Sequence, residues 1–261
     1  MDAGERLDVT LRLVQGAERA SVSELAQRLG VSEMTVRRDL DTLERRGLVR
    51  RVHGGAVATR PRTEAGGFAD RAAWSAATKD RLGAAVAELI APGSRVLLDA
   101  GTTTVHVARA LAGQGPLTVT ALSLQTAVCL ADQPGIELLV AGGRSRPGEQ
   151  SLVGPLTVRA LESLAFDVFV MSIGGVHAEY GWSEFSLDDA AVKQAGIAQA
   201  ARVLAVADAT KLGVRAFGQV APLAAAHEFV TDRSAADPAL HPAGPRTLDA
   251  LRDAGVLIHS A

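Results

Sequence analysis

Seven short runs of consecutive apolar residues constrain the fold of this 261-residue chain most strongly. They lie at residues 95–99, 117–121, 136–141, 168–173, 203–207, 228–231 and 256–259, and stretches typical of helices separate most of them. Because apolar residues follow one another in these runs instead of alternating with polar ones, we expect both faces of each strand to be covered. The pattern predicts a mostly parallel α/β sheet with helices on both sides.

The first 45 residues carry signals for three short helices. Spacing typical of one helix face is seen at Leu7, Leu11 and Val14, and again at Val36, Leu40 and Leu43. Between them, Ser21 and Glu24 form a capping-box pattern, in which each side chain satisfies a free backbone amide at a helix start. We expect this second helix to end at Gly30 and a third to begin after Ser32.

A short alternating segment at residues 48–55 follows the third predicted helix and ends in the turn Gly54-Gly55. Three short helices followed by a small basic hairpin are typical of a winged helix-turn-helix. The sequence therefore predicts this fold for the N-terminal part of the chain.

The third predicted helix and the hairpin are rich in arginine. Between Thr35 and Arg62 eight arginines stand against three acids, a net charge of +5, although the whole chain carries -2. On a helical wheel, Met34, Arg38 and Arg45 point away from the apolar face. In a major groove, arginine binds guanine O6 and N7 with two hydrogen bonds, and hydroxyl groups reach phosphates or base edges. The pattern favours DNA binding; an ordinary solvated helix with Arg–Asp pairs is the alternative.

The segment between the two parts has no apolar periodicity and contains the turn signals Arg60-Pro61-Arg62 and Gly66-Gly67. We interpret it as a linker. The predicted organisation is a DNA-binding domain at residues 1–57, a linker at 58–75, and a larger α/β domain at 76–261.

A glycine followed by three threonines comes directly after the first predicted strand of the larger domain. Asp99 ends the strand, and Gly101 and Thr102–Thr104 lead into a helix. Glycine allows a ligand to approach the backbone, and hydroxyls together with the free amides of a helix start can bind an anion. The alternative is that the threonines only cap the helix. The motifs GxxxxGK[ST] and GxGxxG are absent.

Other strand ends are expected at the same edge, because the strands of a parallel sheet all end on one side. Ligands of such sheets bind at these carboxyl ends. These ends contain Gly142-Gly143, Gly174-Gly175, and Asp208 followed by Lys211. Lysine is scarce in this chain: there are three lysines, at positions 79, 193 and 211, against 24 arginines. Lys211 could neutralise a phosphate, and Asp99 and Asp208 could accept hydrogen bonds from sugar hydroxyls. A surface or capping role is the alternative for each of these residues.

Several other functions find little support in the sequence. The six histidines are scattered and Cys129 is the only cysteine, so we expect no metal site and no intrachain disulfide. The motif GxSxG is absent, and we expect no catalytic residues. Glu179, Glu184 and Asp188 lie near a glycine-rich turn, where a carboxylate base for sugar isomerisation could lie; a sugar-phosphate isomerase with an added domain is therefore the alternative.

No apolar run reaches the roughly 18 residues that a membrane-spanning helix needs. The first residues lack the order of basic and then apolar residues typical of a signal peptide. We expect a cytoplasmic protein without a membrane partner.

The segment at residues 31–40, VSEMTVRRDL, followed by RRVHGGA at residues 50–56, resembles the DNA-binding signature of the DeoR family of bacterial transcriptional regulators. The resemblance runs from about residue 5 to residue 57. It implies that Ser32, Thr35, Arg37 and Arg38 lie on operator DNA and that Arg50, Arg51 and His53 form the wing.

The larger domain is similar to the sensor domain of the same family in the segments at residues 98–104 and 207–211, in the paired glycines and in Lys193. The family's sensor domain is related in fold to ribose-5-phosphate isomerase and typically binds a phosphorylated sugar. Ala121 stands where the family usually has Asn, so this chain offers no side-chain amide there. The resemblance covers nearly the whole chain.

These observations predict a repressor of sugar-metabolism genes that a phosphorylated sugar releases from its operator, without a cofactor, acting as a dimer or tetramer. A DNA-binding protein whose larger domain serves only for assembly is the second alternative. The effector site is predicted at Asp99, Gly101, Thr102, Thr103, Thr104, Gly142, Gly143, Gly174, Gly175, Lys193, Asp208 and Lys211.

Overall fold

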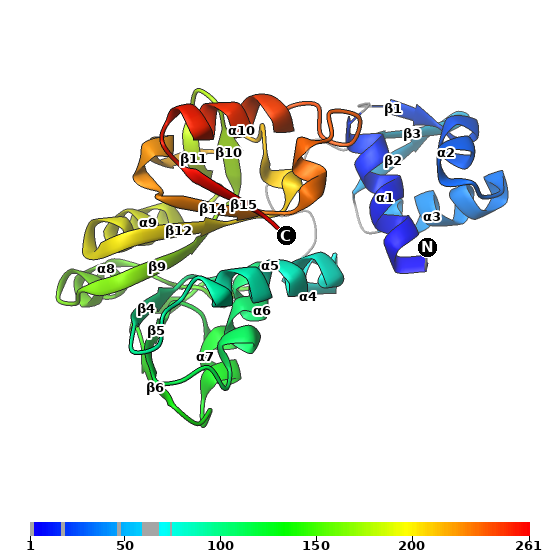
Figure 1. The fold of residues 1–261 in the computed structure, drawn as a ribbon. Coiled ribbons are helices and arrows are strands. Elements are labelled where there is room, and N and C mark those ends of the chain that lie inside the picture. Colours follow the sequence, from blue (N-terminus) through cyan, green and yellow to red (C-terminus); the bar gives the residue numbers. More distant parts are fainter. Residues whose placement is uncertain (1–2, 17–18, 46–47, 59–67, 74) are drawn as a thin grey trace.

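The computed structural model describes residues 3–16, 19–45, 48–58, 68–73 and 75–261. A small N-terminal group of helices and strands lies beside a larger α/β part (Figure 1). None of the described helices is long and apolar enough to cross a membrane.

The N-terminal part has the predicted winged helix-turn-helix fold. It contains α1 (Ala3–Gly16), α2 (Val22–Leu29), α3 (Glu33–Arg45), β2 (Val49–Val52) and β3 (Gly55–Ala58). Apolar residues from all three helices and the hairpin form its core, among them Leu11, Leu25, Val36, Leu40, Leu43 and Val49. The capping box of Ser21 and Glu24 is present, and Gly30 ends α2 with φ of 65°.

One strand of this part was not expected from the sequence. β1 (Arg19–Ser21) pairs antiparallel with β3, so the sheet order is β1-β3-β2 and the predicted hairpin becomes a three-stranded sheet. A Cβ atom at Gly55 would lie 2.2 Å from the backbone oxygen of Ala20. The glycine is therefore needed at this point for the close approach of β1 and β3.

The larger part is built on a sheet of seven parallel strands within residues 75–261. Its order is β15-β14-β12-β9-β4-β5-β6. The strands are β4 (Arg95–Leu98), β5 (Leu117–Ala121), β6 (Ile136–Val140), β9 (Phe166–Ser172), β12 (Ala200–Val206), β14 (Glu228–Thr231) and β15 (Leu257–Ser260). Each of the seven predicted runs forms one of these strands.

Helices cover both faces of the sheet (Figure 1). One face carries α5 (Ala76–Glu88), α6 (Thr102–Leu111) and α7 (Leu124–Leu130); the other carries α8 (Pro155–Glu162), α9 (Leu187–Gln199) and α10 (Gly244–Asp253). Successive strand residues alternate between the two apolar clusters, with Leu97 on the α9 face and Val96 and Leu98 on the α6 face. This two-sided burial explains the continuous apolar runs.

The sheet order has a consequence for ligand binding. From β4 the chain adds β5 and β6 on one side and then returns to add β9 on the other side of β4. The direction of winding therefore reverses between β4 and β9. In open α/β sheets, ligands bind outside the carboxyl ends of the strands at such a reversal.

Short elements that the sequence did not predict surround this edge. β10 (Gly175–His177), β11 (Gly181–Glu184) and β13 (Gly218–Ala221) form a small antiparallel sheet, and β7 (Arg144–Ser145) pairs with β8 (Leu152–Val153). Two- to four-residue strands are too short for a periodic signal.

Part of the predicted linker is helical. α4 (Phe68–Ala73) lies directly before α5 and packs against α6. The turn signals at residues 60–62 and 66–67 lie outside the described residues. A six-residue helix is too short to show the periodicity on which the linker interpretation depended.

Candidate functional site

The N-terminal half of α3 presents its polar side chains to solvent. Ser32 lies just before the helix, and its Oγ accepts a hydrogen bond from the backbone amide of Thr35 (3.2 Å) and lies 2.9 Å from Thr35 Oγ1. Arg37 contacts Glu33 (3.2 Å) one turn earlier. Arg38 is exposed and makes no side-chain hydrogen bond or ion pair to the described residues. Of these residues, Arg38 is the one whose guanidinium has no competing partner there.

A partly buried ion pair fixes α3 on α1. Asp39 lies on the inner side of α3 and accepts two hydrogen bonds from Arg6, at 2.7 and 3.1 Å. Two parallel hydrogen bonds fix both the distance and the orientation of the partners. The exposed face of α3 is thereby held in one orientation.

The two arginines of the hairpin differ in their surroundings. Arg50 is exposed, whereas Arg51 is half-buried and its guanidinium contacts Asp41 and the backbone oxygen of Arg37, both on α3. His53 is exposed at the hairpin turn. The structure thus presents Arg50 and His53 to solvent and uses Arg51 to join the hairpin to α3.

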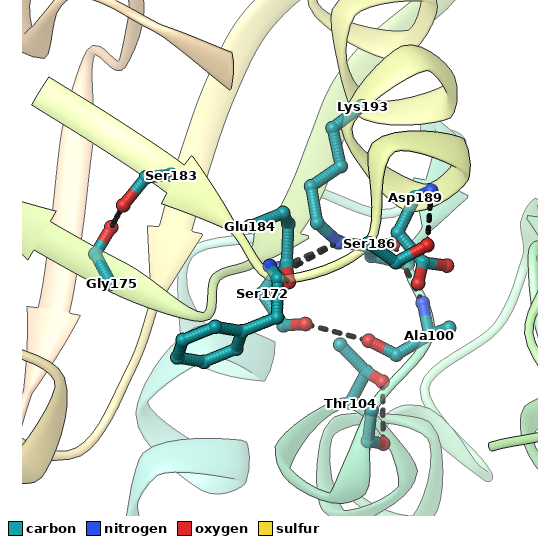
Figure 2. Close-up of polar contacts among 12 residues, drawn as sticks. Ala100, Thr104, Ser172, Gly175, Ser183, Glu184, Ser186, Asp189 and Lys193 are labelled. Carbon is teal, nitrogen blue, oxygen red and sulfur yellow. Dashed lines mark hydrogen bonds and ion pairs between the residues drawn. The ribbon is translucent and has the colours of Figure 1, made fainter. Parts of the chain in front are cut away.

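In the larger part, Asp99 and Lys193 meet where the winding of the sheet reverses. Asp99 follows β4 and accepts hydrogen bonds from the backbone amides of Ala100 (2.8 Å) and Ser172 (3.0 Å) and from Lys193 Nζ (2.5 Å). Lys193 reaches this point from α9 and also lies 3.5 Å from Glu184 (Figure 2). The ion pair joins the carboxyl ends of β4 and β9 to α9.

Burial and charge act in opposite directions on this pair. Burial raises the pKa of Asp99 from 3.8 to about 6, although Lys193 and the Ala100 amide lower it. Burial acts against the charge of Lys193, but Asp99, Glu184 and Asp189 outweigh it and raise its pKa. Both groups are therefore charged at neutral pH.

The start of α6 lies beside this ion pair. Gly101 has φ of 127°, and a Cβ atom there would lie 2.9 Å from Ser172 Oγ, which donates to the oxygen of Ala100 (2.6 Å; Figure 2). Thr104 Oγ1 donates back to the oxygen of Gly101 (2.9 Å), and no side chain caps the helix. The hydroxyls of Thr102 and Thr103 make no hydrogen bond to the described residues. The helix start therefore keeps free amides and two free hydroxyls.

Asp208 brings the two other lysines into the same region. It follows β12 and accepts a hydrogen bond from the amide of Thr210 (3.0 Å). Burial acts against its charge, but Lys211, the Thr210 hydroxyl and Lys79 favour that charge, so its pKa lies below the ordinary value. Lys79, on α5, is buried and donates to the backbone oxygen of Arg71 in α4. All three lysines of the chain thus lie near the carboxyl edge of the sheet.

The paired glycines have other surroundings. Thr157 Oγ1 donates to the oxygen of Gly142 (2.6 Å), and a Cβ atom at Gly143 would lie 2.0 Å from that hydroxyl. A Cβ atom at Gly174 would lie 2.8 Å from Glu184, and one at Gly175 would lie 2.5 Å from the oxygen of Val214. Gly143, Gly174 and Gly175 therefore allow close packing around the edge, whereas a Cβ atom at Gly142 would meet nothing within 4 Å.

The sequence indicated Glu184 only as a possible carboxylate base, whereas in the structure it contacts Lys193. It did not indicate Arg146, whose Nε lies 2.9 Å from Asp189 at the start of α9, or Arg71 of α4, which contacts the buried Glu149. These last two contacts join segments far apart in the chain, so spacing carried no signal. No cluster of potential metal ligands occurs among the described residues.

Comparisons with known proteins agree with these two parts of the molecule. Residues 6–62 match the DeoR-like helix-turn-helix domain, and residues 74–233 match the DeoR C-terminal sensor domain. The chain is a DNA-binding transcriptional regulator with a sensor domain, not an enzyme. It belongs to the DeoR family, as the resemblance in its sequence predicted.

Named relatives are similar over most of their length. The chain is 35% identical over 231 residues to the HTH-type transcriptional regulator GlpR of Haloferax volcanii, and the match covers 87% of this chain and 89% of that protein. It is 33% identical over 227 residues to the HTH-type transcriptional repressor CsqR of Escherichia coli, covering 87% of each. It is 28% identical over 232 residues to the glycerol-3-phosphate regulon repressor of Escherichia coli, covering 89% and 92%.

Among solved structures, ribose 5-phosphate isomerase A from Methanocaldococcus jannaschii matches 52% of this chain and 54% of its own, with 15% identity and a TM-score of 0.39.

Proposed function

We propose that this protein represses genes of sugar metabolism and leaves its operator when a phosphorylated sugar binds at the carboxyl edge of the seven-stranded sheet. The observation that carries the proposal is the uncapped start of α6, with the free Thr102 and Thr103 hydroxyls, at the point where the winding of the sheet reverses. Relatives named as the aga operon transcriptional repressor and the glycerol-3-phosphate regulon repressor support the assignment as a repressor.

On the DNA side, we place the N-terminal half of α3 in the major groove. Arg38 is free to bind a guanine edge with two hydrogen bonds, and Ser32, Thr35 and Arg37 lie where contacts to phosphates or neighbouring bases are possible. Arg50 and His53 of the hairpin contact the backbone beside the groove. Arg51 holds the hairpin in place.

On the ligand side, the phosphate lies against the amides and hydroxyls at residues 101–104, where the helix dipole favours negative charge. Lys211 supplies a positive charge, and the carboxylate of Asp208 accepts from sugar hydroxyls. For Asp99 we propose a positioning role instead of the hydrogen bond to a sugar hydroxyl that its sequence position suggested. Its oxygens accept from Ala100, Ser172 and Lys193, so it holds Lys193 in place at the ligand.

A route from this site to the DNA-binding part passes through α4. This helix packs against α6, and its Arg71 contacts Glu149 and accepts a hydrogen bond from Lys79 at its backbone oxygen. A ligand that orders the start of α6 thereby acts on the element nearest the linker. The coupling cannot exceed the difference in affinity between the two arrangements, typically about 1–3 kcal/mol.

The ligand site is tested by calorimetry with sugar phosphates and the same sugars without phosphate. We expect wild-type protein to bind one or more phosphates and to bind the bare sugars at least tenfold more weakly. The double variant Thr102→Ala, Lys211→Ala should lose this preference.

The control for this double variant is Thr78→Ala, Arg252→Ala. It removes a hydroxyl from α5 and a cation from the last turn of α10, and it should bind sugar phosphates as wild type does. Equal binding of sugars and phosphates, or full affinity in the double variant, would contradict the site. If no sugar phosphate changes the affinity for operator, the alternative in which the larger domain serves only for assembly is favoured.

A further inference from the structure

One large apolar side chain of the winged helix lies in solvent. Met34 is 60% exposed, and no other large apolar residue is exposed among the described residues before residue 59. It takes no part in the apolar core formed by α1, α2, α3 and the hairpin. An unbranched, flexible side chain of this size is available to a partner surface.

Met34 lies in the first turn of α3 and shares a face with Arg38, four residues later. The opposite face of the helix is occupied by Val36 and Leu40, which are fully buried. In a helix-turn-helix, the residues at the start of the recognition helix, which corresponds to α3 in this chain, reach the base edges. If Arg38 contacts a base in the major groove, Met34 on the same face of α3 therefore also lies next to the bases.

The major groove offers one apolar group, the C5-methyl of thymine. Contact with this methyl removes apolar surface of both partners from water and needs no hydrogen bond. We propose that Met34 is a specificity-determining residue that selects thymine in the operator through van der Waals contact with its C5-methyl. This inference rests on the proposed placement of α3 in the groove.

The helix geometry also sets where this thymine lies. Residues four apart on a helix surface are separated by about 5–6 Å between Cβ atoms. Successive base pairs are separated by about 3.4 Å. The thymine therefore lies one or two base pairs from the guanine that Arg38 binds.

The test uses the full chain and an operator obtained by selection from random duplexes. Each thymine is replaced in turn by deoxyuridine, which pairs identically but lacks the methyl group. We expect one substitution per half-site to weaken wild-type binding by about fourfold, the effect of exposing one buried methyl group. Met34→Ala should bind the thymine and deoxyuridine duplexes equally, whereas Met34→Leu, which keeps an apolar side chain, should retain part of the preference.

Arg38→Ala separates failure of this inference from failure of the proposed function. It should lose the preference for guanine and keep the preference for thymine over deoxyuridine. If Arg38→Ala weakens operator binding but Met34→Ala distinguishes thymine from deoxyuridine as wild type does, the inference on Met34 is wrong and the placement of α3 stands. If neither variant changes operator binding, both are wrong.

Discussion

At the scale of single residues, the pair of Asp99 and Lys193 combines two roles. It is nearly inaccessible to solvent, and it joins β4, β9 and α9 at the proposed ligand site. Removing one partner of a buried ion pair leaves an uncompensated charge, whereas removing both leaves none. We expect Lys193→Met to lower the free energy of unfolding by about 3–5 kcal/mol, because it leaves the buried Asp99 carboxylate without its cation.

Adding Asp99→Asn to Lys193→Met should restore part of that loss, because the carboxylate left without its cation becomes neutral; chemical denaturation of the two variants would measure this. The pH dependence gives a second reading. The pKa of Asp99 is raised from 3.8 to about 6, so on acidification the folded protein binds this proton before the unfolded chain does. This group therefore favours the folded state as the pH falls through this range, and Asp99→Asn should remove that contribution. An unchanged pH profile would contradict the burial of the charge.

Arg50 and Arg51 form a matched pair of neighbouring arginines with different expected effects. Arg50→Ala should weaken binding to all DNA sequences similarly and reduce the salt dependence by about one unit, because the proposed placement of the hairpin brings this exposed arginine onto phosphate. Arg51→Ala should lower the thermal stability of the winged helix, because it loses the contact with Asp41. Salt titrations of operator binding and thermal unfolding measure these effects. A salt slope lowered by Arg51→Ala alone would reverse the assignment.

At the scale of elements, α4 is the proposed connection between ligand and DNA. Glu149→Gln weakens its contact with Arg71 without changing the ligand site or the DNA-binding surface. Operator affinity and sugar-phosphate affinity should each stay near the wild-type value. The factor by which one ligand weakens the other should fall toward one from a typical 5- to 150-fold. The control Glu179→Gln changes an exposed carboxylate that contacts Arg246. Equal coupling in wild type and Glu149→Gln would exclude this route.

The elements also show how far sequence reasoning extends. All seven strands of the sheet were predicted, because burial on both faces leaves a continuous apolar run. The helices of the N-terminal part followed from caps and periodicity, as at Ser21. β1, α4 and the small sheet of β10, β11 and β13 were missed, because three to six residues are too few to show a period.

For the ligand site, the sequence indicated the strand ends but not the contacts between them. Gly101 and Thr102–Thr104 were found because they follow a strand directly. That Lys193 forms an ion pair with Asp99, 94 positions away, depends on the packing of α9 on the sheet. Lys79 was noticed as one of three lysines, but nothing in its neighbourhood of the sequence indicated that it lies close to Asp208.

At the scale of the whole molecule, the two parts meet at Leu240. This residue precedes α10 and packs against the apolar core of the winged helix. Among the described residues, Leu240 is the one apolar residue of the larger part that packs against this core. We expect so small an apolar contact to join the parts weakly, so that rearrangement requires little disruption.

The size of the DNA-binding part predicts an oligomer. One such module buries about 600–1,000 Å² on DNA, little for a specific repressor. A symmetric oligomer that binds two half-sites gains affinity without further base contacts. Sedimentation of the full chain should therefore show at least a dimer at micromolar concentration. A monomer that binds a single operator tightly would contradict this prediction.

The central claim is that one molecule binds operator and phosphorylated sugar in opposition, and reciprocal titration tests it most directly. The affinity for operator is measured with and without saturating sugar phosphate, and the affinity for sugar phosphate with and without saturating operator. Linkage requires both ratios to be equal, and we predict that each ligand weakens the other by the same factor. A sugar phosphate that binds at the carboxyl edge of the sheet and leaves operator affinity unchanged would contradict the account.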